Sequence, residues 1–498
     1  MKNILISIKM MAVVLLLSSC SDSFGDINVD PNNPSTVSPN LILPVAQNYT
    51  AFSQERNRGN NTLGNLMMYN WSQSDGFSWY TDEFLYLVTP SFYQQNFDYV
   101  YANALKQYNS LSILEGDVNG NYVAIGNIMK AYHFNILVDT YGDIPYSEAL
   151  KRGGDPTPKY DNAQEIYTDL VAQLTAAIKL IDATAANTTI KPLVPGTDDG
   201  MFKGDMMMWK KFANSIKLRM LTRQSGMAAR TAYINTELAV IAAEGSGYIT
   251  KDVEVNIGYN AQTNQQNPKW DAFGKDVSGT VTNNNLATSA TDYILAYLTS
   301  TNDPRINFLY EKPATGHLGV KQGLQNYDET PAGPDGLVPA KVSNIGPGIL
   351  KSAAQGAVLY TLAESYFNQA ELDLKFKAAA NAQALYESGI QASFTYLGAG
   401  SATSYFTQAK NLVNWNTSTN KLEAIITQKW IAVNGIDAIQ SWFDYNRTGF
   451  PRNLPISALA STPDRPVRLA YPASEVTSNG MNLPAQPNVF TAKIFWAN

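Results

Sequence analysis

Cysteine and histidine are nearly absent from this chain of 498 residues. It has one cysteine, Cys20, and two histidines, His133 and His317, which lie far apart with no ligand spacing around either. A single cysteine excludes a disulfide framework and a cysteine-rich zinc site. We therefore predict no metal centre, and we expect each histidine to be an ordinary surface or core residue.

Charge is also scarce. Charged residues make up 16% of the chain and the net charge is −6, against a usual charged fraction of about 25%. This balance lacks the basic footprint that nucleic-acid binding requires. The polar surface must come mainly from amides and hydroxyls, and the chain also carries 28 Tyr, 19 Phe and 8 Trp. Aromatic rings beside neutral amides suit a sugar, whose C–H face packs on the ring.

Catalytic signatures are missing as well. The sequence has no Gly-x-Ser-x-Gly elbow, no His-Glu-x-x-His and no phosphate-binding Gly-Lys-Ser/Thr loop, and each of these motifs supports a specific chemistry. Acidic residues are plentiful, so a pair of carboxylates for glycoside hydrolysis stays open, because its defining separation is not visible in a sequence. We predict a protein that is not an enzyme and that uses no cofactor.

Long apolar runs are confined to the N-terminus. Lys2 precedes an apolar stretch from Ile4 to Leu17, and Ser18 and Ser19 lead to Cys20. This pattern predicts a secretory signal peptide, since the run is too short for a spanning helix. Residues 17–20 resemble a bacterial lipobox, which implies that Cys20 becomes a lipidated first residue. The alternative is an ordinary signal peptide with a stray cysteine.

The remaining chain is predicted to be mainly helical. After a signal peptide at 1–19, the Pro- and Asn-rich residues 20–40 indicate an irregular tether, followed by a single helical domain at 41–498. Ala163 and Tyr167, like Ala382 and Tyr386, have the spacing of tetratricopeptide helix pairs, although no regular repeat follows. Apolar residues at helical spacing predict helices over 41–62, 97–114, 122–138, 162–181, 205–222, 353–374, 378–393 and 421–433.

Three long loop-rich stretches separate these helices, at 69–93, 247–285 and 317–348. Loops of this length usually carry function or are disordered. Their aromatic side chains are therefore candidates for ligand contact. The alternative is that these rings fix the loops onto the helical body or face a partner protein. The candidates are Trp71, Trp79, Tyr80, Tyr93, Tyr259 and Trp270.

Several short motifs follow one another along the chain. They occupy residues 139–150 (DTYGDIPYSEAL), 204–219 (GDMMMWKKFANSIKLR), 303–305 (DPR), 363–370 (AESYFNQA), 425–430 (IITQKW), 442–451 (WFDYNRTGFP) and 468–472 (RLAYP). Together with the lipobox they resemble the SusD/RagB family of nutrient-binding outer-membrane lipoproteins of Bacteroidetes. The motif residues themselves have structural character. We expect Arg219 and Glu364 to form a buried ion pair and Arg447 to join a turn to the helix behind it.

The resemblance implies a SusD-like, mainly α-helical fold and a surface-exposed lipoprotein, lipid-anchored in the outer membrane. It also implies a partner, a SusC-like TonB-dependent barrel, over which the protein sits as a lid and to which it delivers a nutrient. Composition favours a glycan as that nutrient. Two alternatives stay open: capture of peptides, as in the RagB branch, and a structural lid that binds no ligand itself.

Overall fold

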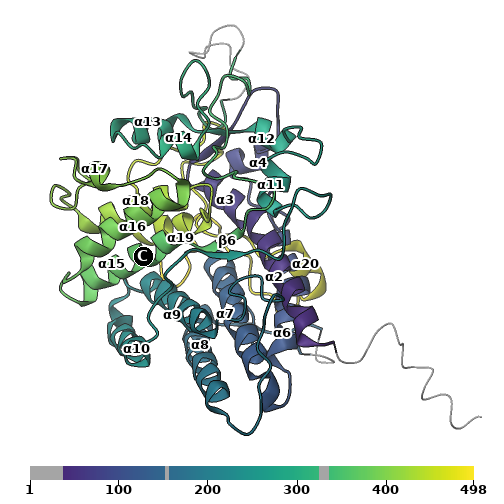
Figure 1. The fold of residues 1–498 in the computed structure, drawn as a ribbon. Coiled ribbons are helices and arrows are strands. Elements are labelled where there is room, and N and C mark those ends of the chain that lie inside the picture. The colour runs from purple at the N-terminus through teal and green to yellow at the C-terminus, as the bar shows by residue number, and fades with distance from the viewer. Residues whose placement is uncertain (1–36, 152–155, 325–335, 498) are drawn as a thin grey trace, which may run out of the picture.

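The computed structural model describes residues 37–151, 156–324 and 336–497 (Figure 1). The predicted signal peptide, Cys20 and most of the predicted tether lie outside these residues. Within them the chain is mainly helical, as expected, and its strands form three small two-stranded antiparallel sheets. No helix among the described residues combines the length and apolar character needed to cross a membrane.

The first half of the chain builds a layer of long helices. Helix α7 (Gly120–Tyr141) is buried along almost its whole length, because α6 (Lys106–Ser112), α8 (Ala163–Ala186) and α9 (Met206–Arg223) all pack against it. Helix α8 instead buries one apolar stripe, which includes Ile166, Leu170 and Leu174. A short helix α5 (Gln95–Tyr99) and a π-helical segment (Val100–Leu105) lead into α6.

The second half adds the helix pair α15 (Leu362–Phe376) and α16 (Ala382–Leu397), which α18 (Lys421–Val433) covers. Helix α19 (Ile439–Thr448) packs in turn on α18. Gly389 allows the close approach of the pair, because a Cβ there would lie 2.8 Å from the Phe367 ring. The prediction that the first helix of this pair begins at residue 353 was wrong. Residues Ala357–Tyr360 form strand β6 on β4 (Val253–Val255), and Thr361 caps the helix by accepting from the Glu364 amide.

The N-terminal helix also differs from its prediction. Helix α2 (Pro39–Glu55) ends before residue 62, and a new helix α3 (Asn60–Met67) follows. Arg58, in the left-handed region with φ of 57°, breaks the helical path between them. The sequence patterns also did not predict α10 (Thr231–Glu244) and α13 (Asp292–Ser300).

Short elements from the predicted loop stretches gather at one end of the molecule, at the top of Figure 1. Strands β1 (Trp71–Gln73) and β5 (Thr288–Ala290) pair there, so that Trp71 faces Ala290 in the register. The helices of this loop layer are α4 (Thr81–Leu85), α11 (Pro268–Phe273), α12 (Asn283–Ala287) and α14 (Ile306–Leu309). Elsewhere lie β2 (Ile144–Pro145) with β3 (Tyr160–Asp161), α17 (Thr403–Phe406), α20 (Ala473–Ser478) and two 3₁₀ turns (Asp117–Asn119 and Ala228–Arg230).

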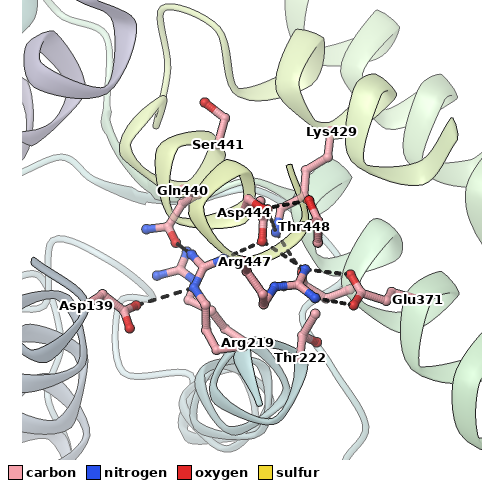
Figure 2. A network of polar contacts seen from close by, with 12 residues as sticks. Asp139, Arg219, Thr222, Glu371, Lys429, Gln440, Ser441, Asp444, Arg447 and Thr448 are labelled. Carbon is pink, nitrogen blue, oxygen red and sulfur yellow. Dashed lines mark hydrogen bonds and ion pairs between the residues drawn. The ribbon is translucent and has the colours of Figure 1, made fainter. Parts of the chain in front are cut away.

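A network of buried charges joins the two halves (Figure 2). The predicted pair is confirmed: Arg219 of α9 donates from Nε and Nη2 to the two carboxylate oxygens of Glu364 of α15, at 2.8 and 2.7 Å. One turn further along α9, Arg223 contacts Asp139 of α7 and Asp444 of α19. Arg219 and Arg223 share a helix face because they are four residues apart. All of these side chains are about 1% exposed or less.

The same network includes Arg447, which contacts α15 as the helix behind it. It lies in the last turn of α19, so it joins two helices where the prediction had a turn and a helix. Its guanidinium donates to both oxygens of Glu371 on α15, at 2.5 and 2.8 Å, and to Asp444 at 3.1 Å. Lys429 of α18 completes the network with an Nζ–Oδ2 distance of 2.8 Å to Asp444. Each cation thereby pairs with a carboxylate of another helix, so the network fixes how the helices pack.

We predict that Arg219→Met destabilises the fold by about 3–5 kcal/mol, because it leaves the buried Glu364 without its bidentate partner. Urea denaturation measures the loss. The double variant Arg219→Met with Glu364→Met should recover part of it, since the Glu364 carboxylate no longer has to be buried without its partner. Arg452, exposed and paired with Glu423, provides the control: Arg452→Met should cost less than about 1 kcal/mol. An equal loss in both single variants would contradict the prediction.

A second prediction concerns Asp437, which lies between α18 and α19 beside Arg219. Burial raises the pKa of Asp437 to about 7, and the neighbouring Glu364 adds to that rise while Arg219 opposes it. The folded chain therefore binds a proton that the unfolded chain, with an Asp pKa near ~3.9, has released. The stability from this group is present below about pH 4 and is lost as pH rises to about 7.

Asp437→Asn should remove this part of the pH dependence. The unfolding free energy, measured in urea at pH 5 and pH 8, should fall less with rising pH in the variant than in the wild type. Identical slopes would show that Asp437 is ionised throughout.

Candidate functional site

Helix α12 separates two hollows in the loop layer. The first, the Trp79 hollow, has a volume of about 390 Å³ and is lined by Asn57, Arg58, Ser78, Trp79, Tyr80 and Asn284. The second, the Trp270 hollow, has a volume of about 670 Å³, and Asn285 and Leu286 belong to its lining. Because Asn284 lines one hollow and the next two residues line the other, α12 forms the wall between them.

Gln73, at the end of strand β1, builds the turn that carries Trp79. Its side-chain oxygen accepts from the Trp79 amide at 2.7 Å and from the Tyr80 amide at 3.1 Å, and its amide nitrogen donates to the Phe77 carbonyl. Gln73 is fully buried, so these bonds are shielded from water. The Phe77 ring supports Trp79 in an edge-to-face contact with centroids 5.4 Å apart. The Phe77 ring and the Gln73 hydrogen bonds therefore fix the position of the half-buried Trp79.

Polar side chains from distant segments complete the Trp79 hollow. Arg58 donates to the Trp79 carbonyl at 2.9 Å, and the Asn57 amide donates to the Asn284 side-chain oxygen at 3.0 Å. The left-handed backbone at Arg58 turns its side chain away from the helical path and toward this hollow. The lining contains one cation, amides and hydroxyls, and no carboxylate. Such a set can bind neutral hydroxyls but offers no acid–base pair for hydrolysis.

A buried carboxyl, Glu83 of α4, lies beneath Arg58. The Arg58 Nε is 3.5 Å from its Oε1. Burial raises the pKa of Glu83, while the positive charge of Arg58 lowers it. Arg58 is thus anchored by its carbonyl contact on one side and by Glu83 on the other, with its side chain still about half exposed.

The Trp270 hollow is anchored to the helical body through the residues before the tryptophan. Asn267 caps α11 by accepting from the Lys269 and Trp270 amides, and its own amide donates to Glu55 of α2 at 3.0 Å. The buried Lys269 ammonium lies 3.2 Å from the same Glu55. Gly274 lets the indole of Trp270 lie flat on the backbone, because a Cβ there would come within 2.6 Å of the ring.

Four of the six candidate aromatics are buried in the structure. Trp71, Tyr80, Tyr93 and Tyr259 are buried, each at most 7% exposed, and belong to the main hydrophobic core. The Trp71 ring packs on Phe273, and the Tyr80 hydroxyl bonds Thr288 at 2.8 Å. These rings hold the loops onto the body, the alternative that the sequence left open. Trp79 and Trp270 remain candidates because both are half-buried and line hollows.

Sequence reasoning missed Asn57, Arg58 and Asn284. Asn57 and Arg58 were assigned to a continuous helix, and Asn284 lay in a stretch rich in polar residues with nothing to single it out. The hydrogen bond from Asn57 to Asn284 spans 227 residues, so no local pattern could bring them together.

A further exposed feature lies on α2, away from both hollows. Val37, just before the helix, and Leu41, Val45 and Phe52 along it are 44%, 61%, 42% and 39% exposed. We call these four residues the α2 stripe. Their spacing places the helical members on one face. The α2 stripe begins one residue after the end of the segment that the structure does not describe.

Comparison with protein families decides the identity of the fold. The model of the SusD-like family described as "Starch-binding associating with outer membrane" matches residues 31–472. The chain belongs to the SusD-like family. Members of this family are binding proteins, and the family is associated with the outer membrane and with binding of glycans. A comparison with curated proteins finds no match.

Solved structures agree with this assignment at the level of the fold. A chitin-binding protein is 24% identical, with a TM-score of 0.72, over 93% of this chain and 100% of its own. A SusD homolog from Bacteroides uniformis is 23% identical, with a TM-score of 0.73 over the same shares. A chitin-binding SusD homolog from Flavobacterium johnsoniae is 21% identical, with a TM-score of 0.73, over 92% of this chain and 98% of its own. The predicted SusD-like helical fold is confirmed.

Proposed function

We propose that this SusD-like protein binds an oligosaccharide in the Trp79 hollow. The observation that carries the proposal is a fixed indole beside one guanidinium and two carboxamides, with no carboxylate in the lining. The indole offers an apolar face to the C–H side of a sugar ring, and Arg58, Asn57 and Asn284 offer hydrogen bonds to its hydroxyls. Chitin-binding proteins among the structural relatives support a glycan as the ligand.

The action we propose is capture without chemistry. Binding raises the local concentration of the sugar beside a transport pore, and release follows when the lid moves. Capture of peptides and a purely structural lid are the alternatives. A panel of oligosaccharides and peptides titrated into the isolated protein separates the three, because a structural lid binds neither.

We further propose the membrane context. Residues 1–19 serve as a signal peptide, Cys20 carries the lipid, and a tether leads from Cys20 to the start of α2 at Pro39. The residues from Pro39 onward form one domain. A lipid attached there anchors the chain without a spanning helix. The partner is a SusC-like TonB-dependent barrel in the outer membrane, and the α2 stripe is the surface offered to it. Its position beside the tether and its exposed apolar side chains support this role.

Trp79→Ala should weaken binding of an oligosaccharide ligand at least tenfold, which corresponds to about 1.4 kcal/mol, because the stacking face is lost. Isothermal titration calorimetry on purified protein measures the change. Phe52→Ala, which removes a partly exposed ring outside the lining of the hollow, is the matched control and should leave the affinity unchanged. Equal affinity of wild type and Trp79→Ala would remove Trp79 from the site.

Leu41→Glu combined with Val45→Glu should reduce co-purification of the barrel from detergent-solubilised membranes severalfold, because two carboxylates would have to be desolvated at the contact. Val476→Glu, at an apolar side chain 47% exposed on α20, is the control and should leave co-purification intact. Calorimetry with the oligosaccharide shows whether the double variant still folds and binds. Undiminished co-purification would show that the α2 stripe is not the interface.

A further inference from the structure

The Trp270 hollow differs chemically from the Trp79 hollow. Most of its lining is apolar, and its volume of about 670 Å³ lies within the range of small-molecule sites, about 300–1,000 Å³. It opens beside exposed apolar groups, with Val281 37% exposed at its edge. The apolar lining comes from Trp270, Val281, Leu286, Val338, Ile345 and Leu350.

Two opposite charges face this hollow. Lys275 and Glu311 both belong to the lining, and they come from segments that only the fold brings together. Neither side chain forms a hydrogen bond or an ion pair with another residue of the described part of the chain. The positive charge of Lys275 nevertheless acts on the Glu311 carboxyl, whose pKa burial raises and Lys275 lowers. The apolar hollow thus carries one cation and one anion, both on solvent-exposed residues and within electrostatic reach of each other.

A third polar group is left unsatisfied in the wall. Asn344 is 6% exposed, and its Oδ1 accepts no hydrogen bond from any described residue. Its amide nitrogen makes only a long contact, 3.4 Å, to the Pro339 carbonyl. Buried polar atoms are nearly always paired, so the Asn344 oxygen is an exception, although it is shielded from the open hollow. The neighbouring Asn285 differs, because its amide donates to Phe273 at 2.7 Å.

We propose that the Trp270 hollow binds a small zwitterion with an apolar body, the chemistry that apolar α-amino acids and their dipeptides share. The ammonium group pairs with Glu311, the carboxylate pairs with Lys275, and the apolar body packs on Trp270 and Ile345. A neutral sugar would leave both charges unused and would place its hydroxyls against aliphatic side chains, which costs free energy.

The test is calorimetric titration of the purified protein with L-phenylalanine and with L-phenylalanyl-L-leucine. N-acetyl-L-phenylalaninamide, which has the same ring but no charges, is the comparison ligand. We expect at least one zwitterion to bind, and the neutral derivative to bind at least tenfold more weakly. The tighter of the two zwitterions shows whether the site prefers a free amino acid or a dipeptide. Absence of binding by both zwitterions at millimolar concentration, or equal binding of the neutral derivative, overturns the proposal.

Variants locate the site. Glu311→Gln and Lys275→Met should each weaken the zwitterion at least tenfold, and Val281→Trp, which fills the hollow, should abolish binding. Asp271→Asn, at an exposed carboxylate outside the lining, is the control for Glu311→Gln. Thermal unfolding checks that each variant folds.

Trp79→Ala should leave zwitterion binding intact, so failure here and failure of the oligosaccharide proposal are separate results. Unchanged binding in all three hollow variants also overturns the proposal.

Discussion

The buried charge network is the constraint on which the rest of the structure depends. Arg219, Arg223, Lys429 and Arg447 lie in the core and contact carboxylates from α7, α15 and α19. A buried charge without a partner costs several kcal/mol, whereas an apolar contact tolerates sliding. The network therefore penalises every packing of these helices except the one that pairs all of its charges. It adds specificity to a core whose apolar residues alone would permit several arrangements.

The same physical solution extends into the loop layer. Glu55, at the last turn of α2, contacts both Lys269 and Asn267, and its Oε1 also accepts from the Val358 amide of β6. One buried carboxylate thus joins the N-terminal helix, the small central sheet and the segment that carries Trp270. Gln73 likewise fixes the segment that carries Trp79, in this case with neutral hydrogen bonds. Both hollows are consequently supported by buried polar contacts, which is what a preorganised binding surface requires.

The helical body could be predicted from the sequence because its signals are local. Apolar spacing located α7, α8, α9 and α18 to within a few residues, and the family motifs anticipated the pair Arg219–Glu364. The candidate site could be predicted only in part. Aromatic residues in polar stretches mark either anchors or ligand contacts, and only tertiary packing separates buried Trp71 from half-buried Trp79. The position of the Arg58 side chain depends on a left-handed backbone conformation that no residue pattern predicted.

This outcome changes which features of a long polar loop point to a binding surface. A ring that packs into the core already has its contacts within the protein. Its presence therefore explains why the loop is ordered and not what the loop binds. The residues that stay available are those beside the anchors: Trp79 follows the buried Gln73 contact, and Trp270 follows the buried Lys269. The buried anchors are required because a half-exposed indole on an unrestrained loop would have to be ordered when ligand binds. The conformational entropy lost in that ordering would offset the free energy gained from the contact with the ligand. Burial of most of the loop aromatics is therefore the condition under which the remaining two can act.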